Sequence, residues 1–223
     1  MNTERFSDLQ RRAAIHAALA DPARLAIVDA LTLGDASPSE LQALVGLPSN
    51  LMAHHLKVLE SQGIVTRSRS EGDRRRTYLR LVPGSLAVVP GAPNGVPRVV
   101  FVCTHNSARS HLAAALWRRS SSVPAASAGT HPADQIDPGA LAVAARHQLP
   151  LRRIRPRKVE DVLRPDDLII TVCDSAHEEL GAARTVHWSI PDPVPVGSDE
   201  AFEAAFTQLS QRVGDLATRF TAN

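Results

Sequence analysis

The chain of 223 residues has 43% hydrophobic residues, which suffices for one or two domains with a buried core. Its net charge is only +2, no apolar run approaches the roughly 18 residues of a membrane span, and the N-terminus lacks an apolar signal core. We therefore expect a soluble, cytoplasmic protein with no membrane partner. Two cysteines, Cys103 and Cys173, exclude a disulfide scaffold and a four-cysteine zinc site.

A segment rich in Pro and Gly divides the chain. Seven of the fifteen residues in 83–97 are Pro or Gly and none is charged, so no helix should cross this stretch. The sequence thus predicts a first domain over residues 1–82, a linker over 83–97 and a second domain over 98–223. The excess of positive charge lies in the first part, with 11 Lys+Arg against 9 Asp+Glu, while the rest carries 14 of each.

Helix start and stop signals recur through the first domain. Asp21-Pro22 is an N-cap followed by proline, and Ser37 with Glu40 forms a capping box for a short helix that ends at Gly46. The next helix opens at Pro48-Ser49 and stops at Gly63. Two helices joined by a short turn containing glycine are typical of a helix-turn-helix.

The second of these helices has two faces. Met52, Leu56 and Leu59 form an apolar stripe, and short polar or basic residues occupy another face at helical spacing. Such residues on a recognition helix can contact base edges and phosphates. The solvated face of an ordinary helical bundle would show the same sequence pattern. The candidate DNA-binding residues on this helix are Ser49, Asn50, Ala53, His54 and Lys57.

A basic hairpin comes next in the chain. The sequence IVTRSRSEGDRRRTYLRL alternates, turns at Glu71-Gly72-Asp73 and alternates again. A helix-turn-helix followed by a β-hairpin is a winged helix (α+β), and its wing is expected to contact backbone phosphates rather than only solvent. The arginines predicted to do so are Arg67, Arg69, Arg74, Arg75 and Arg76.

The segments ALADPARLAIVDAL and HHLKVLESQGIVTRSRSEGDRRRTYLRL resemble the ArsR family of metalloregulatory repressors, over residues 10–82. The resemblance implies a homodimer on a palindromic double-stranded DNA operator, although the linker replaces the family's usual closing helix. Arsenic-sensing members carry cysteines before the recognition helix, and this domain has none. His16, His54 and His55 are isolated or lie on the DNA helix, so we expect no metal site.

A cysteine loop opens the second domain. The apolar run Arg98–Val102 predicts a buried parallel strand, followed by Cys103, the residues THNSA, then Arg109-Ser110 and a helical run. A loop at a helix N-terminus turns its amides inward and forms a nest for a tetrahedral oxyanion, where a thiolate is also favoured. Arg109 would clamp two oxyanion oxygens and Ser110 would donate to the sulfur. The predicted oxyanion-binding residues are Thr104, His105, Asn106, Ser107, Ala108 and Arg109.

Two alternatives stand beside this interpretation. Cys103 could simply end a core strand, but that would predict no particular residues six and seven positions later. Asp192, in the proline-flanked loop HWSIPDPVP, is a candidate proton donor for a leaving group. An aspartate between prolines is also an ordinary turn former.

The motifs FVCTHNSARS, SAGT, LIITVC and PDP, in that order over residues 98–215, resemble the low-molecular-weight protein tyrosine phosphatase fold. The resemblance implies an α/β domain with a four-stranded parallel sheet, helices on both sides and a phosphatase-type P-loop. It assigns the nucleophile to Cys103, the anion clamp to Arg109, the loop asparagine to Asn106 and the thiolate partner to Ser110. The general acid falls on Asp192.

Within that superfamily CTHNSARS and HWSIPDP look more like the arsenate reductases. Phosphatases commonly follow the Asp-Pro with an aromatic residue, and here Val194 follows. Thioredoxin-coupled relatives use two further cysteines; Cys173 matches the first, but Leu180 stands at the second. Cys173 could still form a disulfide with Cys103, or it could be a packed thiol at a strand end.

The incomplete cysteine relay resembles the arsenate–mycothiol transferase subgroup. It implies no bound cofactor, a low-molecular-weight thiol such as mycothiol or glutathione as reductant, and a redoxin partner: mycoredoxin, glutaredoxin or thioredoxin. The leading hypothesis is a bifunctional transcriptional regulator and arsenate reductase for arsenic resistance, with arsenate or phosphate as the bound oxyanion. The alternatives are a DNA-tethered tyrosine phosphatase and a non-enzymatic regulator that responds to an oxyanion.

Overall fold

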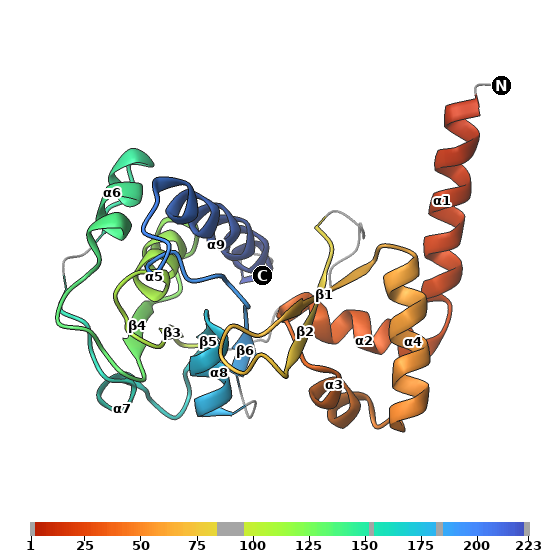
Figure 1. Cartoon of the computed structure of the whole chain (residues 1–223), viewed down its shortest axis with the longest axis horizontal. Coiled ribbons are helices and arrows are strands. Elements are labelled where there is room, and N and C mark those ends of the chain that lie inside the picture. The colour runs from red at the N-terminus through yellow and green to blue at the C-terminus, as the bar shows by residue number, and fades with distance from the viewer. Residues whose placement is uncertain (1–2, 84–95, 152–153, 182–184, 221–223) are drawn as a thin grey trace. The chain divides into compact units, whose positions relative to one another are not determined.

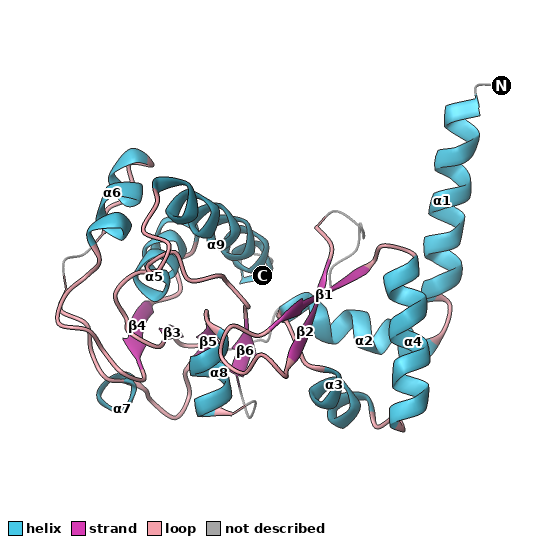
Figure 2. Ribbon diagram, in the orientation of Figure 1, coloured by secondary structure: helices cyan, strands magenta, loops and turns pink. Residues whose placement is uncertain are grey.

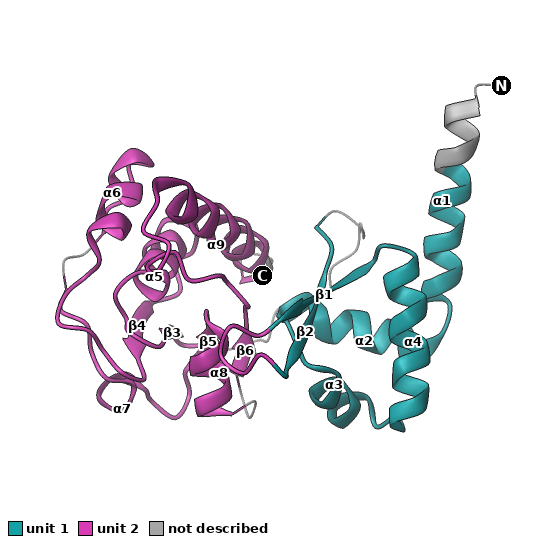
Figure 3. Ribbon diagram, viewed as in Figure 1, with its two compact units in different colours: residues 1–69, 75–90 teal, residues 70–74, 91–223 magenta. Residues whose placement is uncertain are grey.

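A computed structural model describes residues 3–83, 96–151, 154–181 and 185–220 of the chain (Figure 1). The chain forms two compact units: Met1–Arg69 with Arg75–Pro90, and Ser70–Arg74 with Gly91–Asn223 (Figure 3). The loop Ser70–Arg74 therefore belongs to the second unit, although the strands on either side of it belong to the first. Most of the predicted linker, residues 84–95, lies outside the described residues.

The described residues of the first unit begin with the helices α1 (Thr3–Leu19), α2 (Pro22–Leu33), α3 (Pro38–Val45) and α4 (Ser49–Ser61). Their predicted start signals are present in the structure. The Asp21 carboxylate accepts from the Arg24 amide at 3.0 Å, and Ser37 and Glu40 form a reciprocal capping box. Gly46, at φ 70°, ends α3, because glycine adopts the left-handed conformation at little cost.

A hairpin completes the helix-turn-helix fold predicted for this unit. Strands β1 (Val65–Arg69) and β2 (Thr77–Leu81) pair antiparallel, and a bridge from Ala36 to Leu79 adds a short third edge. One apolar core holds helices and hairpin together, because each element contributes buried side chains. Its members include Ile27, Leu31, Leu41, Met52, Leu56, Leu59, Ile64 and Leu79.

The second unit is built on a parallel sheet (Figure 2). Its strands are β3 (Val99–Cys103), β4 (Ala125–Gly129), β5 (Leu168–Thr171) and β6 (Thr185–His187), in the order β4-β3-β5-β6. All neighbouring pairs are parallel, which confirms the predicted four-stranded sheet. Strand β3 includes Cys103 as its last residue, one position beyond the predicted strand.

In the described part of this unit, the sheet is accompanied by helices α5 (Arg109–Ser120), α6 (Pro138–Arg146), α7 (Val159–Val162), α8 (Asp174–Leu180) and α9 (Asp199–Phe220). Helix α5 packs on β3, β4 and α9, while α8 contacts β3, β5 and β6. Trp117 and Trp188 are buried against Phe101 in the core, with ring centroids 6.1 and 5.8 Å from it.

The strand order reverses between β3 and β5. In an open parallel sheet, the crevice outside the carboxyl ends of the strands at such a reversal is the usual ligand site. Cys103 ends β3, and Cys173 comes after β5 at the same edge of the sheet. The topology thus brings the two cysteines to the place where an α/β domain most often binds its ligand.

Candidate active site

The loop between β3 and α5 has its carbonyl groups turned outward. The oxygens of Cys103, Thr104, His105 and Ser107 accept hydrogen bonds of 2.8–3.2 Å from the amides of Thr130, His131, Ala133 and Asp137. Because a trans peptide holds its N–H opposite its C=O, the amides that follow these carbonyls face the inside of the loop. Such inward amides form an anion nest at the start of α5.

Asn106 fixes the shape of this loop. Its φ of 48° lies in the left-handed region, which asparagine tolerates better than most residues. Its side-chain NH₂ group donates to the Ser110 hydroxyl at 2.8 Å, and its side-chain oxygen Oδ1 accepts from the backbone amide of Arg157 at 2.9 Å. The asparagine therefore ties the loop to the first turn of α5 and to the segment before α7.

Gly129, in the SAGT motif, lets β4 approach the loop closely. A Cβ at this position would lie 2.7 Å from the carbonyl oxygen of Thr104 and 2.9 Å from the amide nitrogen of Asn106. Both contacts are with backbone atoms and cannot be relieved by a rotamer change. The sequence resemblance marked the motif but gave this glycine no role.

Donors converge on the sulfur of Cys103, which is only 2% exposed. The Asn106 amide donates to Sγ at 3.2 Å, and the Ser110 hydroxyl lies 3.1 Å from it. Since the Ser110 oxygen already accepts from Asn106, its own proton can point to the sulfur. The donors and the N-terminus of α5 suit a negatively charged sulfur.

Arg109 and Asp192 meet beside the loop. Arg109 is 5% exposed, and its two terminal nitrogens donate to the Ile190 carbonyl at 2.8 Å and to the Asp192 carboxylate at 2.7 Å. Burial alone lowers the pKa of Arg109, but Cys173, Cys103 and the nearby carboxylates outweigh burial and raise it. The guanidinium is thus charged within electrostatic reach of both thiols.

Asp192 stands at the rim of the site. Its carboxylate also accepts from the Val194 amide at 3.2 Å, and its side chain is 24% exposed. Val194 itself is exposed. This placement gives the carboxyl group contact both with Arg109 and with solvent.

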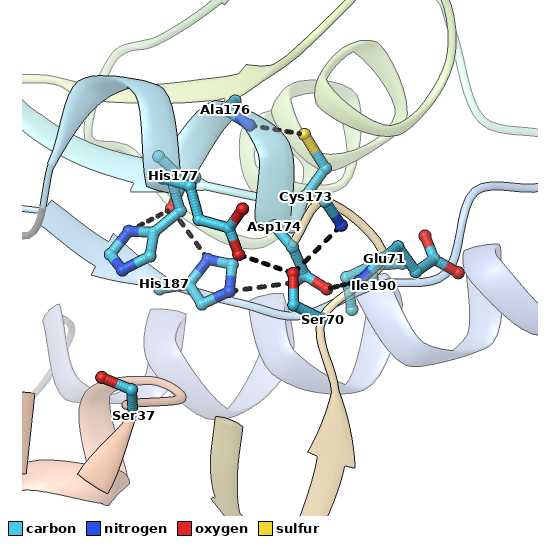
Figure 4. A network of polar contacts seen from close by, with 12 residues as sticks. Ser37, Ser70, Glu71, Cys173, Asp174, Ala176, His177, His187 and Ile190 are labelled. Atoms are coloured by element: carbon cyan, nitrogen blue, oxygen red, sulfur yellow. Dashed lines mark hydrogen bonds and ion pairs between the residues drawn. The ribbon is translucent and has the colours of Figure 1, made fainter. Parts of the chain in front are cut away.

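Cys173 lies close to the loop but in a different setting. It is 2% exposed and caps α8, its sulfur accepting from the Ala176 amide at 3.4 Å (Figure 4). The Thr104 hydroxyl lies 3.3 Å from the same sulfur. Burial raises the pKa of Cys173, and although Arg109 acts against it, Cys103 adds to the rise.

A buried polar network that the sequence did not reveal lies next to Cys173 (Figure 4). Asp174 contacts His187 Nε2 at 3.1 Å, and Thr171 contacts His187 Nδ1 at 2.9 Å. The ring of His177 stacks on that of His187 at 4.1 Å. Burial opposes ionisation of Asp174, but hydrogen bonds from His187 and from the Glu71 amide lower its pKa overall. No local sequence signal announces this network, because β5, α8 and β6 each contribute a part.

Glu71 is a second residue of the site that no sequence pattern identified, since its surroundings predict only a turn. Its carboxylate accepts from the Asp192 amide at 2.9 Å and lies 3.8 Å from Arg109. Positions 71 and 192 are too far apart in the chain for any spacing rule to pair them.

The candidate DNA-binding residues occupy exposed positions in the structure. On α4 the side chains of Met52, Leu56 and Leu59 are buried, whereas Ser49, Asn50, Ala53, His54 and Lys57 are exposed. All five predicted arginines around the hairpin are exposed too. Arg67 forms an ion pair with Glu60 at 2.9 Å, so part of its charge is already compensated.

A parallel α/β domain with a Cys-x5-Arg-Ser loop at its topological switch point defines a phosphatase-type class of protein, here preceded by a helix-turn-helix. The family model for low molecular weight phosphotyrosine protein phosphatase matches residues 98–223, and the chain belongs to this family. A helix-turn-helix domain model matches residues 19–68.

Individual relatives cover the second unit. The chain is 33% identical over 142 residues to the low molecular weight protein-tyrosine-phosphatase Wzb of Salmonella typhimurium, covering 56% of the chain and 95% of the relative. It is 28% identical over 129 residues to a Halobacterium salinarum protein named "Putative arsenate reductase", covering 54% and 90%. The crystal structure of Wzb from Escherichia coli K30 in complex with sulphate is 27% identical, with TM-score 0.52 and coverage of 56% and 99%. The relatives thus include proteins named as a tyrosine phosphatase and as a putative arsenate reductase.

Among the described residues, no helix combines the length and apolar character needed to cross a membrane.

Proposed function

We propose that the protein is a DNA-binding transcriptional regulator that is also an arsenate reductase. Cys103 is the nucleophile, Arg109 and the amides of residues 104–108 bind the oxyanion, and Asp192 is the general acid. The observation that carries the choice of arsenate over a phosphate ester is the second thiol: Thr104, in the oxyanion loop, lies 3.3 Å from Cys173 Sγ. Hydrolysis of a phosphate ester needs no second sulfur, whereas reduction consumes thiols.

The first step is displacement at arsenic. The Cys103 thiolate forms an S–As bond, an As–O bond breaks, and Asp192 gives its proton to the departing oxygen, which leaves as water. Arsenic remains As(V) in this adduct. Arg109 and the inward amides hold the remaining oxygens, which carry the negative charge. The sulfate complex of the related Wzb supports the general suitability of this family for a tetrahedral oxyanion.

A low-molecular-weight thiolate then attacks arsenic and frees Cys103. The thiol–arsenic adduct leaves the site, and a redoxin reduces it: two electrons pass to arsenic, giving As(III), as two thiols become a disulfide. Mycothiol with mycoredoxin and glutathione with glutaredoxin are the candidate pairs.

Cys173 offers an internal route to the same products. Attack of its thiolate on Cys103 Sγ would form a Cys103–Cys173 disulfide, and the S–As electron pair would leave with arsenic as arsenite. Thioredoxin would then reduce the disulfide. The raised pKa of Cys173 lowers the fraction of attacking thiolate and so slows this internal route, which stands beside the route through an external thiol.

The first unit binds DNA in this proposal. The exposed residues of α4 enter the major groove, and the hairpin arginines contact phosphates of a palindromic operator bound by a homodimer. The match of a helix-turn-helix domain model to residues 19–68 supports DNA binding by this unit. One chain would then both regulate transcription and reduce arsenate.

The test is arsenate-dependent thiol oxidation by the full chain, run in parallel with mycothiol/mycoredoxin, glutathione/glutaredoxin and thioredoxin. We expect turnover with at least one low-molecular-weight thiol, and its loss in Cys103→Ser. Equal rates for wild type and Cys103→Ser would contradict the mechanism.

A tyrosine phosphatase is the second candidate, favoured by the 33% identity to the Salmonella Wzb. Hydrolysis of p-nitrophenyl phosphate, measured on the same protein, separates the two. A kcat/KM for the aryl phosphate far above that for arsenate would replace the reductase proposal with the phosphatase.

A further inference from the structure

The loop Ser70–Arg74 is held in the second unit by hydrogen bonds to α8. The Ser70 hydroxyl donates to Glu178 at 2.6 Å, and the Asp73 amide donates to the other oxygen of that carboxylate at 2.9 Å. The Glu71 amide donates to Asp174 at 2.7 Å (Figure 4). Two carboxylates of one short helix therefore bind the loop through both side chain and backbone.

Gly72 shows how closely the loop fits its seat. A Cβ at this position would lie 2.6 Å from Glu178 Oε2 and 3.1 Å from the Cα of Ser175. A side chain at position 72 would therefore displace the Glu178 carboxylate that binds the loop, and would crowd the backbone of α8 by a few tenths of an ångström. The close approach of α8, and not a special φ, favours glycine here.

The seated loop brings the Glu71 carboxylate to the catalytic groups. It accepts from the Asp192 amide at 2.9 Å and lies 3.8 Å from Nη1 of Arg109. Burial raises the pKa of Glu71, while the Asp192 amide and Arg109 act in the opposite direction. A carboxylate and a tetrahedral oxyanion are both natural ligands of a guanidinium. A bound anion at Arg109 would also be repelled by the Glu71 charge.

We propose that the loop Ser70–Arg74 is an internal competitor of the oxyanion: seating of the loop on α8 and binding of an oxyanion at Arg109 oppose each other. The inference rests on the proposed oxyanion binding by Arg109, and not on the fate of the bound anion. In this proposal the Glu71 carboxylate, which belongs to the chain itself, takes the place of the oxyanion beside Arg109.

The covalent connection of the loop gives the competition a consequence. Residues 70–74 join β1 to β2, the hairpin that carries the predicted DNA-contacting arginines. A DNA duplex that holds the loop away from α8 would strengthen oxyanion binding. By the reciprocity of linked equilibria, the oxyanion would then strengthen DNA binding by the same factor.

The test is calorimetric binding of inorganic phosphate to four full-length proteins: wild type, Glu71→Gln, Gly72→Val and Glu160→Gln. Glu71→Gln removes the competing charge, and Gly72→Val displaces the loop without changing any charge. Glu160→Gln is the matched control, because Glu160 is exposed and pairs only with Lys158 at 3.7 Å among the described ion pairs. We expect phosphate to bind about tenfold more tightly to both loop variants, a typical coupling between linked sites, and unchanged affinity in the control.

Each other outcome overturns the inference. Equal affinities in all four proteins, or no phosphate binding by any of them, would show that the loop does not compete. If phosphate bound more tightly to Glu71→Gln but not to Gly72→Val, the charge of Glu71 alone would explain the result. The position of the loop would then not affect phosphate binding.

Hydrogen exchange supplies a second measurement on the wild-type protein. The amides of Glu71 and Asp73 are hydrogen-bonded when the loop is seated, so phosphate should speed their exchange. Unchanged exchange at saturating phosphate would overturn the proposal. These results are separable from the reductase assay: a chain that binds phosphate in competition with the loop but does not turn over arsenate would refute the proposed function alone.

Discussion

Two neighbouring parallel strands of the second unit end near a cysteine, and the two sites differ in how the chain continues to the next helix. After β3, residues 104–108 separate Cys103 from the first residue of α5, and their carbonyls are held outward. After β5, Cys173 is itself the N-cap of α8. The longer connection leaves room for a nest, whereas the immediate helix start leaves none.

The difference shows that burial alone does not decide what a cysteine does. Both sulfurs belong to residues that are 2% exposed. Each sulfur also has one backbone amide and one hydroxyl beside it: those of Asn106 and Ser110 for Cys103, and those of Ala176 and Thr104 for Cys173. The length of the loop before the next helix, and not residue type, depth or the number of neighbouring donors, assigns the proposed nucleophile.

The alkylation rates of the two cysteines test this comparison most directly. Since burial raises the pKa of Cys173, we expect iodoacetamide to modify Cys103 faster than Cys173 at pH 7, because the thiolate is the reacting form. Mass spectrometry of peptides over a time course measures both sites in one sample. Saturating phosphate should protect Cys103 and leave Cys173 unaffected; faster modification of Cys173 would reverse the assignment of the nucleophile.

The second prediction concerns the residue that shapes the longer connection. Asn106→Ala removes two hydrogen bonds and leaves a non-glycine residue at φ 48°, so we expect a loss of about 3 kcal/mol in the free energy of unfolding. Asn106→Gly loses the same bonds without the strain and should be about 1 kcal/mol more stable than the alanine variant. Urea unfolding of both variants gives the difference. Equal stabilities would mean that the loop relaxes out of the left-handed conformation.

The same contrast explains how far the sequence could predict the site. Cys103, Asn106, Arg109 and Ser110 lie within eight positions, so one strand, one loop and one helix turn bring them together, and their spacing is readable. Asp192 was identified through the family resemblance, since an aspartate between prolines is otherwise only a turn. The helix caps and the alternating hairpin were readable for the same local reason.

Long-range partners were not readable from spacing. Arg157 donates to Asn106, and Glu71 reaches Asp192, through contacts that only the folded chain creates. The role of Gly129 depends on a strand beside the loop, and the Asp174 network depends on two strands and a helix meeting. Such contacts result from tertiary packing, which no periodicity in the chain records.

The smallest predicted effect compares α5 with α8 through their buried histidines. On α8 His177 stacks within a hydrogen-bonded network, whereas on α5 the Nε2 atom of His111 has no hydrogen-bond partner among the described residues. Burial, with Arg118 and Arg157 adding positive charge, lowers the pKa of His111 from 6.5 to about 4. The folded protein therefore resists a proton that the unfolded chain binds readily.

The depressed pKa of His111 sets the sign of the pH dependence. The contribution of His111 to the free energy of unfolding does not change with pH above pH 6.5, and it falls as the pH drops from 6.5 toward 4. Because of this group alone, the free energy of unfolding should be about 2 kcal/mol lower at pH 5 than at pH 7.5. His111→Gln removes the titration, so its unfolding free energy should fall less over the same interval, while the exposed His131→Gln should behave as wild type. Urea unfolding at both pH values measures the effect. If His111→Gln lost as much stability as wild type, the acid sensitivity would lie in other groups, and the beginning of α5 would tolerate a charge beside the oxyanion loop.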